Sequence, residues 1–243
     1  MARIILIETS TALCSVALAE DGRIVAYKES ETPRAQASLT APFVKDLLDE
    51  RGLGVRDCDA VCVSKGPGSY TGLRVGVSTA KGLCFGAGIP LIAVGTLDTL
   101  VYQAADLSSG TASLSSDIAG EPSSSGFRYV VPMVDARRME VYTAVFTPDG
   151  RQLTDTRPQV VEPGNYSELL AEGPVLFIGD GADKCREVLA HPNAHFVQCC
   201  PKASAMLRPA FAAWDARRFE DTAYFEPFYL KEFIATVPRK KLF

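Results

Sequence analysis

Two stretches of this chain follow the same pattern, and this internal repeat constrains the fold more than any other feature of the sequence. The first, RIILIETSTALCSVALAEDGRIVAYKE, begins at Arg3, and the second, RYVVPMVDARRMEVYTAVFTPDGRQLTDT, begins at Arg128. Each has an apolar run ending in an acid, a polar turn, a second run, an Asp-Gly pair and a third, more polar run. Asp-Gly between alternating runs indicates a hairpin. The repeat therefore predicts an α/β fold of two related lobes, each with a β-meander followed by helices.

The two repeats are separated by LSSGTASLSSDIAGEPSSSG, which is rich in Ser and Gly and poor in large apolar residues. Such a composition predicts a flexible linker or an exposed loop. We therefore divide the chain into an N-terminal lobe (1–106), this loop (107–126) and a C-terminal lobe (127–243). We leave open whether the final segment returns to the N-terminal lobe.

Composition narrows the class of protein. The net charge of −4 argues against a free-standing nucleic-acid binder, which is usually basic. The first residues form too short an apolar run for a signal peptide, and no stretch predicts a membrane span, so we expect a cytoplasmic protein. Seven cysteines without a Cys-x-x-Cys pair predict neither a disulfide framework nor a zinc site.

A glycine-rich stretch, SKGPGSYTGLRVG, runs from Ser64 to Gly76 between a predicted strand and a predicted helix. Strand, glycine loop and helix are the parts of a phosphate-binding loop. However, the stretch has no Gly-Lys-Ser/Thr as in a P-loop, and its third glycine comes one residue late for the dinucleotide fingerprint. It therefore matches neither motif, and a hydroxyl from Ser69 to Thr71 is available as a helix N-cap.

Small residues continue into this helix, where Gly72, Gly76 and Ala80 recur every four positions and share one face. Glycine inside a helix is unfavourable by roughly 0.5–1 kcal/mol relative to alanine, so these glycines indicate a close approach by another segment. Two interpretations remain open on the residues alone. The contact lies within the lobe, against the predicted helix from Ala35 to Arg51, or the two helices together form a surface for a partner.

The duplicated meander, the stretch SKGPGSYTGLRVGVSTAKGL and the stretch VDARRMEVYTAVF together resemble the TsaB (YeaZ) family. The resemblance implies an actin-like (ASKHA) fold and a non-catalytic subunit in the synthesis of threonylcarbamoyladenosine at position 37 of tRNA. It implies a heterodimer with a TsaD-type transferase subunit, which carries the active site, and a TsaE-type ATPase. The complex would use ATP and meet tRNA, while this chain would need no cofactor of its own. Two departures are Glu8, where Asp is usual, and Lys231, where Arg is common.

In the family, the first-lobe helices pack against the matching face of the transferase subunit, so the resemblance favours the partner interpretation. It leaves homodimerisation through the same face open. The residues expected at this surface are Leu39, Phe43, Gly68, Ser69, Tyr70, Thr71, Gly72, Leu73, Gly76 and Ala80.

Two alternatives of another class remain open: a stand-alone actin-like ATPase or small-molecule kinase, and a glycoprotease-like peptidase. Secondary candidates for contacting a nucleotide are Glu8, Thr9, Ser10, Asp135, Gly179 and Gly181. The loop ETSTALCS contains no glycine, which hampers backbone approach to phosphate. The only two histidines, His191 and His195, flank Pro192, so we expect no metal site and no catalytic residue.

Overall fold

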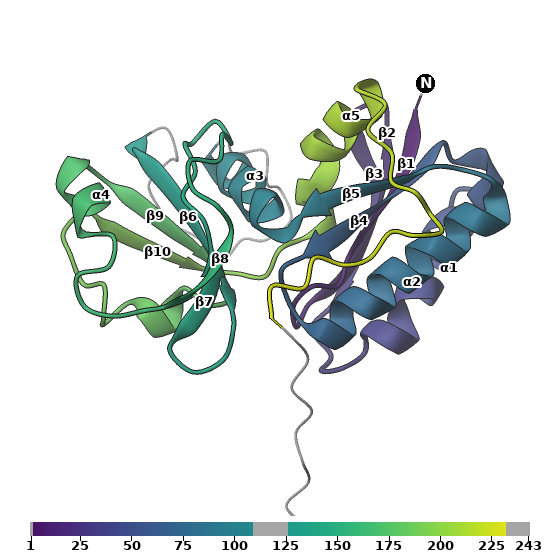
Figure 1. The fold of residues 1–243 in the computed structure, drawn as a ribbon. Helices are drawn as coiled ribbons and strands as arrows, with labels where there is room; N and C mark the ends of the chain where they lie inside the picture. The colour runs from purple at the N-terminus through teal and green to yellow at the C-terminus, as the bar shows by residue number, and fades with distance from the viewer. Residues whose placement is uncertain (1, 109–125, 232–243) are drawn as a thin grey trace, which may run out of the picture.

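The computed structural model describes residues 2–108 and 126–231 and contains two five-stranded sheets side by side (Figure 1). The first has strand order β3-β2-β1-β4-β5, and the second has order β8-β7-β6-β9-β10, so the same order occurs twice. In each sheet the first three strands in chain order form an antiparallel meander. The other two strands extend the sheet by parallel pairing beside the first strand of that meander. The duplicated α/β fold of two related lobes predicted from the repeat is thereby confirmed. The Ser/Gly-rich loop lies almost wholly outside the described residues.

The strands and helices of the first half of the chain are connected by short loops. They are β1 (Arg3–Glu8), β2 (Cys14–Glu20), β3 (Arg23–Ser30), α1 (Gln36–Asp49), η1 (Val55–Asp57), β4 (Ala60–Gly66), α2 (Tyr70–Ala87), β5 (Leu91–Gly95) and α3 (Thr96–Ser108). Asp21 and Gly22 form the β2–β3 turn, both with positive φ, as the Asp-Gly pair predicts.

The second half has shorter elements. They are β6 (Tyr129–Asp135), β7 (Glu140–Thr143), β8 (Arg157–Val160), α4 (Ser167–Glu172), β9 (Val175–Gly179), η3 (Asp183–Cys185), β10 (Ala194–Gln198), η4 (Ala203–Met206) and α5 (Leu207–Asp215). The turn at Asp149–Gly150 forms, since the Thr147 amide donates to the Arg151 carbonyl across it at 2.9 Å. The prediction of a strand directly after this turn is wrong, however, because β7 pairs with the later segment Arg157–Val160.

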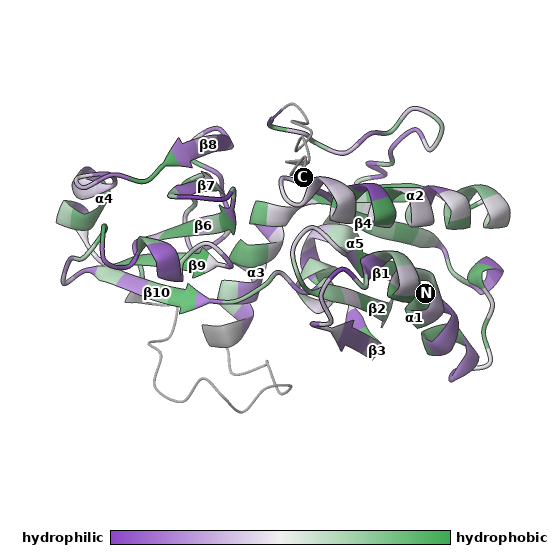
Figure 2. Ribbon diagram, turned by 90° about the horizontal axis from the view of Figure 1, so that it is seen from below, coloured by the Kyte–Doolittle hydropathy of each residue, from purple (hydrophilic) through white to green (hydrophobic). Residues whose placement is uncertain are grey.

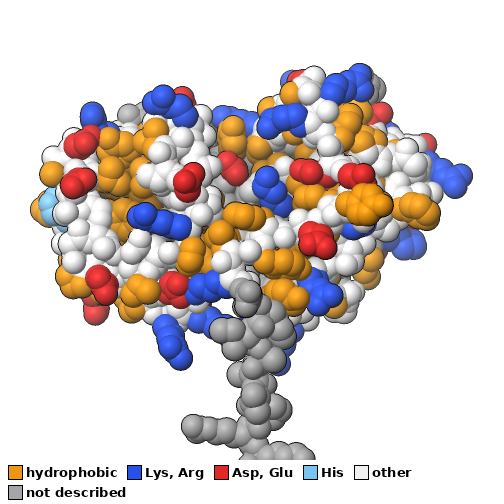
Figure 3. All heavy atoms as spheres, viewed as in Figure 1, with side chains coloured by type: hydrophobic (Ala, Val, Ile, Leu, Met, Phe, Trp, Pro, Cys, Tyr) orange, Lys and Arg blue, Asp and Glu red, His pale blue; other side chains and the backbone are white. Residues whose placement is uncertain are grey.

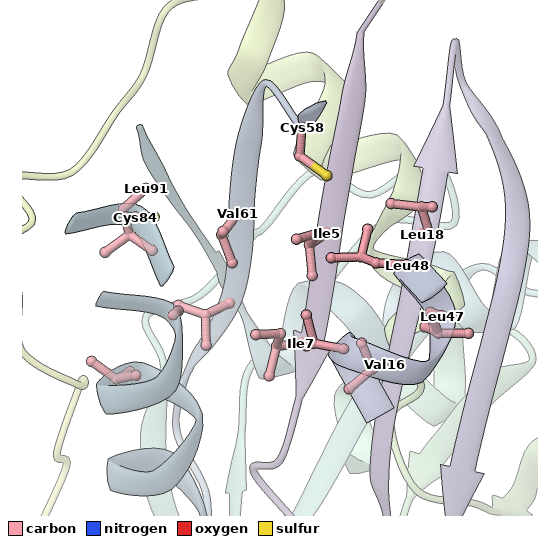
Figure 4. Packing of buried hydrophobic residues seen from close by; sticks show 14 residues of the cluster. Ile5, Ile7, Val16, Leu18, Leu47, Leu48, Cys58, Val61, Cys84 and Leu91 are labelled. Atoms are coloured by element: carbon pink, nitrogen blue, oxygen red, sulfur yellow. The ribbon is translucent and has the colours of Figure 1, made fainter. Parts of the chain in front are cut away.

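Each sheet is covered on both faces. One helix from each half of the chain packs on the sheet of the other half. On one face of the first sheet α1 and α2 bury an aliphatic cluster, which Figure 4 shows around Ile5, Ile7 and Val16. On the other face lie η4 and α5, although they follow β10 of the second sheet. Conversely, α3 follows β5 yet packs its Leu97 and Leu100 on the second sheet. A boundary at residue 106 therefore divides the sequence into two halves, but it does not separate the two packed lobes, because α3 and α5 each pack on the sheet of the other half.

After α5 the chain runs back over the first lobe (Figure 1). Glu220 bridges to Leu91 beside β5, and the ammonium of Lys81 on α2 donates to the carbonyls of Ala223 and Phe225 at 3.1 and 3.0 Å. The Phe228 amide then donates to the Lys65 carbonyl at 2.7 Å. Residues 220–228 thus lie alongside β5, α2 and the end of β4. Among the described residues, none of the helices is both long and apolar enough to cross a bilayer.

Candidate partner-binding surface

The glycine-rich stretch forms the end of β4, a short turn and the start of α2. Ser69 is the N-cap, and its hydroxyl accepts a hydrogen bond from the Gly72 amide at 3.3 Å, which confirms the capping role predicted for this hydroxyl cluster. The Ser69 amide in turn donates to the Ser10 carbonyl at 2.6 Å. The start of α2 is therefore seated on the loop that follows β1, inside the lobe.

The close fit of the glycine-rich stretch on the loop after β1 explains three of the glycines. A Cβ on Gly72 would lie 2.1 Å from the Thr9 carbonyl oxygen, and one on Gly76 would lie 2.3 Å from the Thr9 hydroxyl. A Cβ on Gly68 would lie 2.3 Å from the Ser10 carbonyl oxygen. Thr9 also donates its hydroxyl proton to the Gly72 carbonyl at 2.8 Å. These glycines let α2 approach the backbone of the β1 loop, and the close contact lies within the lobe, against this loop rather than α1.

Part of the expected partner surface therefore needs correction. Leu73 and Ala80 are 1% and 0% exposed, and Gly72 and Gly76 are buried beside them. A partner cannot touch these four residues without unpacking α2 from the sheet. Of the remaining expected residues, Ser69 and Thr71 are exposed, and Leu39, Phe43, Gly68 and Tyr70 are half-buried.

The outer face of α2 carries a different set of side chains. Its exposed residues recur every three or four positions along the whole helix, as a surface stripe requires: Thr71, Arg74, Ser78, Gly82, Phe85 and Gly86. Phe85 is 88% exposed, which is rare for a phenylalanine. A Cβ added at Gly82 or Gly86 would meet nothing within 4 Å, so no contact inside the chain explains these two glycines.

A shallow, open groove of about 410 Å³ lies at the same end of α2 as Phe85, although Phe85 does not line it. It runs between η1 and the last turns of α2 and is lined by Gly54, Val55, Arg56, Gly82, Leu83, Gly86 and Ala87. The lining is small and mainly apolar, so a large apolar side chain from another molecule could enter it. We call the exposed α2 stripe together with this groove the α2 outer face. Sequence reasoning missed Phe85, although its place three residues after Gly82 could have identified it.

The residues of the first lobe that were candidates for contacting a nucleotide are fully buried. Glu8, Thr9 and Ser10 have no exposed surface. One carboxylate oxygen of Glu8 accepts from the Ser10 amide at 2.6 Å, and the other has no hydrogen-bond partner among the described residues. Burial raises the pKa of Glu8 to about 7, a rise that the hydrogen bonds from Ser10 oppose. None of the three can reach a ligand in this structure.

The candidates of the second lobe have structural partners. The half-exposed Asp135 is paired with Lys184, and its amide donates to the Asp180 carboxylate at 2.9 Å. Burial raises the pKa of Asp180 to about 6. Gly179 and Gly181 pack on β6, where a Cβ would meet the Met133 carbonyl at 2.2 and 3.1 Å. Within 2–108 and 126–231, no group of His, Cys, Asp and Glu has an arrangement suited to a metal ion.

Comparison with known proteins identifies the family. A family model described as "TsaD: tRNA N6-adenosine threonylcarbamoyltransferase" matches residues 30–235. The Bacillus subtilis protein named tRNA threonylcarbamoyladenosine biosynthesis protein TsaB is 30% identical over 179 residues, which cover 72% of this chain and 70% of the relative. The chain belongs to the TsaB family.

Other TsaB relatives agree with this assignment. The Escherichia coli TsaB protein is 36% identical over 147 residues, 60% of this chain, and the match spans a little over half, 56%, of that relative. A solved structure entitled "YeaZ from Pseudomonas aeruginosa" superposes with a TM-score of 0.76 at 26% identity, covering 95% of this chain and all of that one. The match to the TsaD family model begins at residue 30 and therefore includes α1 and α2.

Proposed function

We propose that this chain is a non-catalytic subunit in the synthesis of threonylcarbamoyladenosine on tRNA. It binds a TsaD-type transferase subunit through the α2 outer face, with the half-buried Leu39 and Phe43 of α1 at its edge. The α2 outer face is the single observation that carries the proposal. A phenylalanine that is 88% exposed and an open, glycine-lined groove in the same turns of α2 supply an anchor and a pocket of the kind found at protein interfaces.

A subunit role also suits the interior of the first lobe. An enzyme that uses a nucleotide would need the acid at the end of β1 within reach of its ligand. Glu8 instead lies under α2 with no exposed surface, and the Gly68 and Gly72 contacts hold α2 against the neighbouring residues. This packing favours the subunit over a stand-alone kinase. In the proposed complex, ATP is consumed by a TsaE-type ATPase and not by this chain.

The proposal is tested by reconstitution with one component omitted. A TsaD-type transferase, a TsaE-type ATPase, threonylcarbamoyl-adenylate and unmodified tRNA are combined, and modified adenosine is measured with and without this chain. We expect modification to depend on the chain. Indifference of the yield to the chain would contradict the proposal.

The surface itself is tested with a matched pair of variants. Phe85→Ser removes the exposed anchor of α2, and Leu153→Ser removes an apolar side chain that is 42% exposed in the second lobe. Because truncating a central anchor typically weakens an interface by about 2 kcal/mol, we expect Phe85→Ser to reduce transferase affinity roughly 30-fold. Leu153→Ser should leave affinity within about twofold by calorimetry. Equal effects of the two variants would place the interface elsewhere, and self-association that Phe85→Ser abolishes would assign the face to a homodimer.

A further inference from the structure

A row of alternating cationic and aromatic side chains crosses from the first lobe to the second. The guanidinium of Arg74 lies 5.3 Å from the centre of the Tyr70 ring, and that ring packs on Tyr229 with centroids 4.8 Å apart. Two residues further, the ammonium of Lys231 lies 5.7 Å from the centre of the Tyr142 ring on β7. The row thus joins the start of α2, the returning C-terminal segment and the second sheet.

Arg137 extends the row at its second-lobe end. Arg137 lies in the turn that leads into β7, the strand that carries Tyr142. Burial raises the pKa of Tyr142, while the positive charge of Lys231 above its ring lowers it. Tyr229 is 37% exposed, and Arg74, Arg137, Arg138 and Lys231 are exposed as well. In Figure 3, hydrophobic and basic side chains lie next to one another where the described chain ends. We call these side chains the interlobe row.

The β6–β7 turn presents arginines at a conformational cost. Arg137 and Arg138 have φ angles of 69° and 50°, and both therefore lie in the left-handed region. Asn, Asp or Gly is favoured at such positions, and a long side chain there costs about 1 kcal/mol or more. Neither arginine packs into a core, since both are exposed. Residues held in this region cluster at functional sites.

The charges of the interlobe row do not cancel. Lys231 is paired with Glu140 and contributes little net charge. Arg74, Arg137 and Arg138 form no ion pair with another described residue. Three guanidiniums therefore remain available on a chain whose net charge is −4. They offer planar, multidentate donors for phosphate oxygens.

We propose that the interlobe row of this chain contacts the RNA substrate directly, with Arg137 and Arg138 on phosphates and Tyr229 against an unpaired base or ribose. The proposal rests on the proposed function, because the chain must work where tRNA is present. Cations that follow a nucleic-acid backbone combined with tyrosines that stack on bases are the usual chemistry of single-stranded RNA binding. An acidic peptide could use the same arginines, but it has no planar bases to stack on the exposed Tyr229 ring.

The test measures binding of an unmodified tRNA transcript to the full chain by fluorescence anisotropy at several salt concentrations. The key variant is Arg137→Asn with Arg138→Gly, which removes two charges and supplies residues that favour the turn. Its melting temperature should not fall, so a loss of binding cannot be attributed to unfolding. The matched control is Arg217→Asn with Arg218→Gly. This second exposed arginine pair follows α5, on the opposite face of the first sheet from α2, and Arg217 also has a positive φ.

We expect the Arg137/Arg138 variant to bind the transcript at least tenfold more weakly at low salt. The slope of log affinity against log salt should fall in magnitude by about 1.5, as expected for two lost phosphate contacts. The Arg217/Arg218 control should stay within about twofold of the native chain. Tyr229→Leu should weaken binding roughly tenfold with the salt slope unchanged, because stacking and not charge is lost.

Other outcomes overturn the proposal, and transferase binding measured in parallel separates it from the proposed function. If the native chain shows no transcript binding, or the two arginine pairs act equally, the interlobe row is not an RNA site. If the Arg137/Arg138 variant binds RNA normally but loses the transferase, the row contacts protein instead. If the native chain binds RNA through the row but never binds the transferase, the RNA site stands and the proposed function fails.

Discussion

The two faces of α2 contain the same residue type for opposite reasons. On the inner face, Gly72 and Gly76 are glycines because the β1 loop leaves no room for a side chain, with Thr9 atoms 2.1 and 2.3 Å from the missing Cβ positions. On the outer face, Gly82 and Gly86 have nothing within 4 Å. The first pair is explained by the fold of this chain alone. The second pair is unexplained until something outside the chain is placed against it.

The difference between the two pairs shows that the spacing of glycines in a helix does not by itself reveal their role. Spacing by four residues identifies a shared face but does not tell whether that face turns inward or outward. The position of the apolar residues does: Leu73, Val77 and Cys84 are buried with Gly76, so their face meets the sheet. Gly82, Phe85 and Gly86 lie on the other side of the helix.

Gly72→Ala should have the largest effect. Its methyl group would overlap the Thr9 carbonyl oxygen, and this atom belongs to buried backbone that cannot rotate away. Overpacking of this kind typically destabilises a protein by 1–3 kcal/mol, and we expect about 3 kcal/mol or more because backbone must move. Urea unfolding followed by circular dichroism measures this change in the free energy of unfolding.

The control for this substitution is Ser78→Ala, which changes an exposed residue of the same helix and should shift stability by less than about 0.5 kcal/mol. A Gly72→Ala variant as stable as this control would show that the inner-face contact is looser than the structure has it.

The loop under the inner face makes stability depend on pH through Glu8. Burial raises the pKa of Glu8 from 4.5 to about 7, so the folded state binds its proton more tightly than the unfolded state. The resulting stabilisation is fully present below about pH 4.5 and is lost as the pH rises through about 7. It amounts to about 3 kcal/mol at most. We therefore expect native stability to fall over this pH range, as measured by urea unfolding at a series of pH values.

Glu8→Gln is the matched variant, because its side chain has nearly the same shape and stays neutral. The difference in unfolding free energy between the two proteins isolates Glu8, since the raised pKa of Asp180 is common to both and cancels. We expect the variant to gain stability relative to the native chain as the pH rises. A difference that stays constant from pH 4.5 to 8 would mean that Glu8 titrates normally and is reached by water.

The outer face is probed further by Gly86→Trp, which fills the groove from within the chain. Because a Cβ at this position meets open space, the large side chain should leave the fold intact and obstruct an incoming anchor. We expect a loss of transferase affinity at least as large as that of Phe85→Ser, about 2 kcal/mol by calorimetry. Unchanged affinity with an unchanged melting temperature would separate the groove from the interface.

The sequence predicts the general architecture well because the repeat encodes it twice. The meander of the first lobe, the hairpin at Asp21–Gly22 and the Ser69 cap all follow from local patterns. The third strand of the second meander does not, because Arg157–Val160 is largely exposed and contains Pro158, so it has no apolar alternation. Proline is accepted there because this strand lies at the edge of its sheet.

The surface residues are less predictable, since they depend on contacts between distant parts of the chain. The exchange of α3 and α5 between the sheets is not encoded in either helix alone, because each carries an ordinary apolar stripe. The stacking of Tyr229 on Tyr70 joins residues 159 positions apart. Only the folded chain brings the interlobe row together, and only it separates the inner from the outer glycines of α2.

Gly82→Ala should have the smallest effect, and it tests the comparison most directly. Since its methyl group meets nothing, alanine should stabilise the helix by about 0.5–1 kcal/mol, the opposite sign to Gly72→Ala in the same helix. The same methyl group narrows the groove, so transferase affinity should fall several-fold while the melting temperature rises. A variant that gains stability and also keeps its full affinity would show that Gly82 faces water in the complex, and the outer-face glycines would then need another explanation.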